Sequence, residues 1–148
     1  MLFRSEGLET LRYSTDRIAV VMPAEHVLAR VPKMSFNDVL EEEIVALEAG
    51  SSMMRLLAQQ AVIAGGTLHL RVEVRSFDAV CRMVQVGFGL GLLPYQAASV
   101  LGQGLGLAVR PLTEEWAERE MLICVNKERM SNTSVAKLLT YLEATRDA

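Results

Sequence analysis

The stretch Val72–Tyr95 constrains the fold of this chain more than any other, because it reads as a strand, a helix and a second strand. Apolar and polar residues alternate over residues 68–75, the period of a strand that buries one face strongly. Apolar residues at helical spacing follow, with Ser76 placed to cap the helix and Gly87 to end it. Residues 88–93 form an apolar run that is too short for a helix. The stretch therefore predicts a βαβ unit with a right-handed connection and both strands in one sheet.

Strands and helices alternate along the rest of the chain. Further strands are predicted at residues 18–22, 44–47, 107–109 and 119–126, and further helices at 36–40, 53–64, 96–101 and after a cap at Thr133. Alternation of this kind predicts an α/β fold with a mainly parallel sheet flanked by helices.

Composition excludes several classes of protein. Of the 148 residues 51% are hydrophobic and 22% charged, which is typical of a globular domain and not of a disordered chain. The net charge is −3 and the basic residues are scattered, so we expect no nucleic-acid-binding face. The sequence contains neither an apolar span long enough to cross a membrane nor a signal peptide, so we expect a cytoplasmic protein.

No pattern of catalytic or metal-ligating residues is visible. Cys81 and Cys124 are far apart and lie in apolar segments, so we expect both to be buried hydrophobic residues. His26 and His69 are isolated, and we expect no metal, no cofactor and no enzymatic activity. The glycines of residues 87–91 close a helix and enter a strand, the reverse of a dinucleotide-binding turn, which indicates close packing instead.

Two strand-to-helix turns are candidate binding sites. Gly50, Ser51 and Ser52 follow one predicted strand and open a helix, and Ser76 with Phe77 does the same one unit later. Backbone N–H groups and hydroxyls at such a turn suit a carboxylate or a phosphate. The alternative is that the serines only cap their helices.

Three segments, in chain order, carry a resemblance to a known family. They are DRIAVVMP with His26 and Leu28-Ala29 (residues 16–29), Val74-Arg75-Ser76 with Met83-Val84, Gly87 and GLGLLP (74–94), and PLT followed by WAEREMLICV (111–125). Together they cover nearly the whole chain and resemble the effector-binding domain of LysR-type transcriptional regulators.

The resemblance implies a fold like that of type 2 periplasmic binding proteins, in which two lobes are joined by crossover strands. Residues 18–22 and 119–126 would be the crossover strands, and residues 23–118 one complete lobe. Residues 1–17 and 127–148 would be the remnant of the other lobe, truncated at its N-terminal side and lacking the DNA-binding winged helix-turn-helix.

The resemblance also implies a small effector bound in the cleft between the lobes, which the matching strand-to-helix turn faces. The chemistry of the serine turns makes a carboxylate or another anion the expected effector. The expected site residues are Gly50, Ser51, Ser52, Met53, Ser76 and Phe77. A homodimer is the expected assembly, and a partial lobe would leave apolar faces that favour self-association. The alternatives are one lobe of a solute-binding protein for transport, which the missing signal peptide disfavours, and a small-molecule enzyme, which no residue constellation supports.

We predict that this polypeptide does not bind DNA specifically, because it is acidic and has no recognition helix. An electrophoretic mobility shift assay with operator fragments at several salt concentrations tests this. A sequence-selective, salt-sensitive shift would contradict the prediction.

Overall fold

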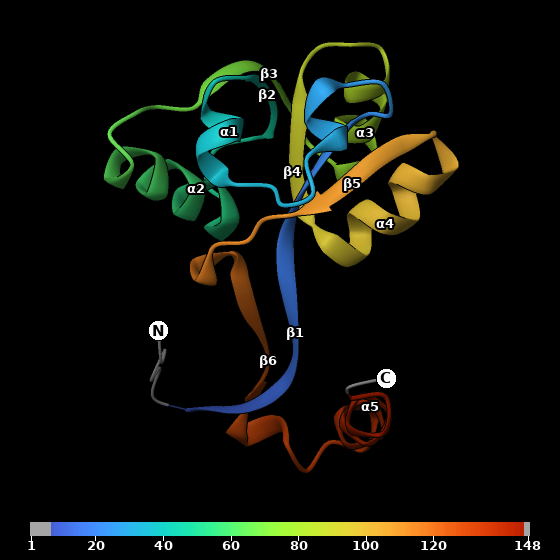
Figure 1. The fold of residues 1–148 in the computed structure, drawn as a ribbon. Coiled ribbons are helices and arrows are strands. Elements are labelled where there is room, and N and C mark those ends of the chain that lie inside the picture. Colours follow the sequence, from blue (N-terminus) through green and yellow to red (C-terminus); the bar gives the residue numbers. More distant parts are fainter. Residues whose placement is uncertain (1–6, 147–148) are drawn as a thin grey trace. The chain divides into compact units, whose positions relative to one another are not determined.

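The computed structural model describes residues 7–146 (Figure 1). Its elements in chain order are β1 (Leu8–Pro23), η1 (Val27–Arg30), α1 (Phe36–Leu40), β2 (Glu43–Leu47), α2 (Ser52–Ile63), β3 (His69–Val74), α3 (Phe77–Gln85), β4 (Leu90–Pro94), α4 (Tyr95–Gly104), β5 (Leu107–Pro111), η2 (Glu115–Ala117), β6 (Glu118–Asn126), η3 (Lys127–Arg129) and α5 (Thr133–Ala144). The described residues divide into two compact units, residues 17–118 and residues 7–16 with 119–146.

The sheet of the larger unit has the strand order β3-β2-β4-β1-β5. β2 pairs parallel with both β3 and β4, whereas β1 pairs antiparallel with β4 and β5. The α/β fold is confirmed, and β3 and β4 share one sheet as predicted, with β2 between them. The sheet is mixed and not mainly parallel, because β1 runs against β4, with Ile18 opposite Pro94.

Local sequence explains where the helices begin. Ser51 and Ser76 accept hydrogen bonds from the backbone N–H groups of Met54 and Ala79, both at 3.1 Å, and so cap α2 and α3. Ser35 and Asp38 form the expected capping box of α1. The prediction for α5 was wrong by one residue, since Asn132 is its cap.

Helices cover both faces of the sheet in this unit. α1 and α2 lie on one face, and α3 and α4 lie on the other (Figure 1). The hydrophobic core between α1, α2 and the sheet contains Met53 and Leu57 of α2. The core on the opposite face contains Val80 and Val84 of α3. Alternate residues of the central strands reach opposite cores, so β1, β2 and β4 are buried on both faces.

β3 does not have the strongly buried face that its alternating sequence predicts. Leu70 is 45% exposed, and Val72 and Val74 are only partly buried. The reason is topological, because β3 is the edge strand of the sheet and, among the described strands, only β2 pairs with it.

The glycines between α3 and β4 serve close packing, as predicted. A Cβ on Gly91 would lie 2.6 Å from Val80 and 2.7 Å from Val21, so only glycine lets α3 approach the sheet here. Gly89 has φ +145°, and a Cβ there would lie 2.5 Å from the Glu43 carbonyl oxygen.

The smaller unit is held together by strand pairing and polar contacts. β6 pairs with β1, and Arg12 forms an ion pair with Glu120 at 3.1 Å. None of the described residues of α5 is buried, and Leu138 is 57% exposed. Within residues 7–146, no helix combines the length and the apolar character that a membrane span needs.

We predict that Gly89→Ala destabilises the protein by about 2–4 kcal/mol, because it adds backbone strain to a clash with a main-chain oxygen. Gly104→Ala is the matched control, since a Cβ there meets nothing within 4 Å and alanine favours the helix. Urea unfolding followed by circular dichroism measures both. A Gly89→Ala variant as stable as the control would refute this account of the turn.

Candidate functional site

Three helices of the larger unit begin along the carboxyl ends of its parallel strands, which we call the carboxyl edge of the sheet. The parallel strands β2, β3 and β4 all end at this edge, and α2, α3 and α4 follow them. α2 leaves toward one face, whereas α3 and α4 leave toward the other (Figure 1). In open α/β sheets, ligands bind at the carboxyl ends of strands whose following helices leave toward opposite faces.

The first of these turns contains Gly50, Ser51 and Ser52. Gly50 has φ +110°, a conformation that glycine adopts without strain, and it turns the chain from β2 into α2. Ser51 is the N-cap and Ser52 the first residue of the helix. The side chain of Met53 is 4% exposed and packs in the core, so only its backbone N–H belongs to the turn.

The second turn contains Ser76 and Phe77 and lies beside the first. The backbone N–H of Glu48 donates to the Val74 carbonyl at 2.9 Å and joins the ends of β2 and β3. Phe77 packs against both hydrophobic cores, as does Leu47. A side chain that contacts both cores lies where the two faces of the sheet meet, so Phe77 separates the hydrophobic cores from this edge.

Two features of this edge were missed by the sequence reasoning. α4 begins directly after β4, with Pro94 at its cap, and no side chain within residues 7–146 caps it. Glu48 and Arg75 are the first residues after β2 and β3, and they form an ion pair at 2.8 Å. Two patterns in the sequence indicate these features. A helix follows the strand that ends at Pro94, and Glu48 and Arg75 carry opposite charges at equivalent places after β2 and β3.

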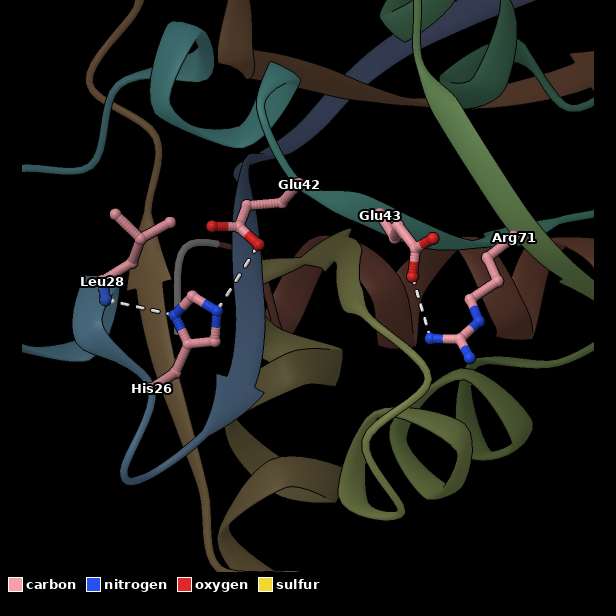
Figure 2. A network of polar contacts seen from close by, with 5 residues as sticks. All are labelled: His26, Leu28, Glu42, Glu43 and Arg71. Atoms are coloured by element: carbon pink, nitrogen blue, oxygen red, sulfur yellow. Dashed lines mark hydrogen bonds and ion pairs between the residues drawn. The ribbon is translucent and has the colours of Figure 1, made fainter.

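A second polar cluster lies at the other, amino-terminal end of β2 (Figure 2). His26 faces Glu42 at 3.6 Å and accepts the Leu28 N–H at 3.1 Å, while Arg71 pairs with Glu43 at 2.8 Å. A cavity of about 250 Å³ opens beside His26 and the two glutamates. Both carboxylates have partners within the chain, and no group of residues in this described cluster is arranged to hold a metal ion.

The described part of the chain contains no metal-binding cluster, and its two cysteines differ in exposure. No group of three or more His, Cys, Asp or Glu residues within residues 7–146 is arranged to hold a metal ion. Cys81 is buried in the core between α3 and the sheet, as predicted. The prediction for Cys124 was wrong, because it is exposed on β6, where the described residues cover the strand only in part.

Comparison with known proteins identifies relatives over almost the whole chain. The family model described as the LysR substrate binding domain matches residues 2–147. A probable RuBisCO transcriptional regulator of Synechocystis sp. (strain ATCC 27184 / PCC 6803 / Kazusa) is 22% identical over 137 residues, which are 90% of this chain and 40% of that protein. The uncharacterized HTH-type regulator YvbU of Bacillus subtilis (strain 168) is 26% identical over 123 residues, 82% of this chain and 38% of its own. The chain thus spans less than half the length of these relatives.

Solved structures show the same fold. The CcmR regulatory domain of Synechocystis PCC6803 in complex with 2-PG matches with a TM-score of 0.84 and 16% identity, over 99% of this chain and 71% of that one. The effector binding domain of QuiR in complex with shikimate matches with a TM-score of 0.80 and 14% identity, over 99% and 68%.

We predict that a thiol reagent modifies Cys124 rapidly in the native protein and Cys81 only after unfolding. Burial, and secondarily the nearby Asp78 carboxylate, raise the pKa of the Cys81 thiol, so less of the reactive thiolate exists at a given pH. Ellman's reagent at neutral pH, with and without urea, measures the two rates. Cys124→Ser should abolish the fast phase and Cys81→Ser should leave it; the reverse result would contradict the burial of Cys81.

Proposed function

Because the chain belongs to the family of LysR substrate binding domains, we propose that it binds its effector at the carboxyl edge of the larger unit's sheet. The chain is the effector-binding regulatory domain of a LysR-type regulator, and this family is not enzymatic. What remains to be assigned is the place of binding and the chemistry of the effector.

The observation that carries the proposal is the start of three helices at one edge, on opposite faces of the sheet. Each helix N-terminus presents backbone N–H groups without intrahelical acceptors and the positive end of a dipole. Three such ends along one edge attract an anion, and the chemical group that fits is a carboxylate or a phosphate.

Two similar domains support an anionic effector. The solved complexes of related regulators contain shikimate, which carries a carboxylate, and 2-phosphoglycolate, which carries a carboxylate and a phosphate. We propose a small carboxylate or phosphate ester for this chain as well.

The residues of the two serine turns have separate roles in this proposal. Gly50 and the backbone N–H of Met53 shape the first turn, while Ser51 and Ser52 present hydroxyls to the anion. Ser76 does the same on the second turn, and Phe77 forms the floor. Capping and anion binding are compatible, since a serine hydroxyl that accepts from the backbone N–H still has its own proton to donate.

The assembly of the whole regulator is also a proposal. Residues 23–118 act as one lobe, with 18–22 and 119–126 as crossover strands and residues 1–17 and 127–148 as part of the other lobe. Copies of the domain pair as a homodimer in the cytoplasm, and DNA is bound by a different part of the parent protein. Exposed apolar residues such as Val62 and Ile63 of α2 support such pairing.

We predict that Ser51→Asp impairs binding of 2-phosphoglycolate at least about tenfold but leaves the free energy of unfolding within about 0.5 kcal/mol. Aspartate caps a helix as well as serine does, yet its charge repels an anion. Ser52→Ala should weaken binding by roughly 1 kcal/mol, the net value of one neutral hydrogen bond.

Calorimetric titration of the 148-residue chain with 2-phosphoglycolate and with shikimate measures binding, and urea unfolding measures stability. Asn132→Asp is the matched control, because it places the same charge at the cap of α5, outside the larger unit. If Ser51→Asp binds these anions like the unchanged protein, the first turn is only a helix start and the proposed site is wrong.

A further inference from the structure

One ion pair spans the two serine turns. Glu48 directly follows β2 and Arg75 directly follows β3, and the Arg75 Nε donates to the Glu48 carboxylate at 2.8 Å. Arg75 precedes the cap of α3, and Glu48 lies three residues before the cap of α2. The pair therefore brings a cation and an anion of the chain itself to the edge where α2 and α3 begin.

This pair is poorly suited to a structural role. The Arg75 side chain is 86% exposed and the Glu48 side chain 53%, and an ion pair in water contributes little to stability. Backbone pairing between Glu48 and Val74 already joins the two strand ends at 2.9 Å. Breaking the pair therefore costs the fold little, while the guanidinium keeps five N–H donors in a fork that suits a carboxylate or phosphate.

Electrostatics give the pair a consequence for ligand selection. The helix ends and Arg75 make the edge attractive to anions, and the Glu48 carboxylate offsets this attraction when no ligand is bound. An incoming anion must compete with Glu48 for the guanidinium. A neutral molecule gains nothing from the exchange, so the pair discriminates between ligands by charge.

We propose that Arg75 is the charge-selecting residue of the effector site, and that Glu48 holds it until an anionic effector takes the place of the Glu48 carboxylate. This inference rests on the proposed function, because it concerns the same edge of the sheet. It adds a specific exchange of partners that binding at the serine turns alone does not require.

The chain contains a matched pair for comparison. Arg71 and Glu43 join the same two strands at the same distance, 2.8 Å, but at their opposite, amino-terminal ends (Figure 2). The Arg71 guanidinium also lies over the Phe88 ring, 5.1 Å from its centroid, which adds a cation–π contact. Changes to Arg71–Glu43 thus alter the same charges on the same strands, away from the proposed site.

The experiment titrates the 148-residue chain with 2-phosphoglycolate and with uncharged ethylene glycol, following backbone amide signals by NMR. Glu48→Gln should raise the affinity for 2-phosphoglycolate roughly threefold, the scale of one exposed ion pair. Arg75→Gln should weaken it about tenfold, the scale of a charge-assisted hydrogen bond. The variant with both changes should bind 2-phosphoglycolate with the affinity of Arg75→Gln, within about twofold, because Glu48 acts through Arg75. Glu43→Gln and Arg71→Gln should bind like the unchanged chain.

Each outcome decides the proposal. If 2-phosphoglycolate binds and perturbs the amides of Ser51 and Ser76, but the Glu48 and Arg75 variants bind it unchanged, the selection mechanism is wrong and the proposed site stands. If the gain from Glu48→Gln persists without Arg75, Glu48 acts by general repulsion and the exchange is refuted. If the unchanged chain binds no anion at this edge, the proposed function fails and this inference with it. The amide spectra of each variant also report whether it is folded.

Discussion

The parallel pairing of β2 with β3 on one side and β4 on the other is the constraint on which the larger unit depends. It places the carboxyl ends of three strands, and so the starts of three helices, at a single edge. Each crossover between parallel strands must pass over one face of the sheet, and here the crossovers use both faces. The meeting of three helix starts follows from this topology and not from any single residue.

The same pairing demands close approach at the other end of the strands. Gly89 lets the start of β4 approach the Glu43 backbone of β2, and Gly91 lets α3 pack closely on the sheet. At this end of the sheet His26 contacts Glu42, and Arg71 forms an ion pair with Glu43. The two edges of the sheet thus differ in kind. One is closed by glycine packing and paired charges, and the other presents helix ends and exposed hydroxyl-bearing turns.

Charge distinguishes the proposed effector edge from an ordinary set of helix caps. A cap satisfies one backbone N–H, whereas in the proposed site three helix ends and an arginine together favour an anion. In that proposal Glu48 offsets part of the attraction. A domain that senses a small anion benefits from such a device, since the resting site is neither strongly attractive to solvent ions nor closed to an effector.

Much of the fold and part of the site were determined by the sequence alone, because they depend on local physics. Capping by Ser51 and Ser76, the apolar stripe of α3 and the packing role of the glycines in residues 87–91 need only neighbours in the chain or a nearby sheet. The family resemblance in residues 16–125 likewise lies in local patterns, and the family match confirmed it.

Only the tertiary structure decided the rest, because strand order and burial depend on residues far away in sequence. Alternation predicts a buried face for β3, but its position at the sheet edge leaves Leu70 exposed. The apolar neighbours of Cys124 in the sequence predict that it is buried, yet the described residues leave its side chain on β6 exposed. Nothing local reveals that β1 runs against β4, or that Glu48 meets Arg75 across two turns 27 residues apart. Local sequence thus fixes where helices and strands begin, whereas pairing between distant strands decides which turns meet and which side chains remain exposed to solvent.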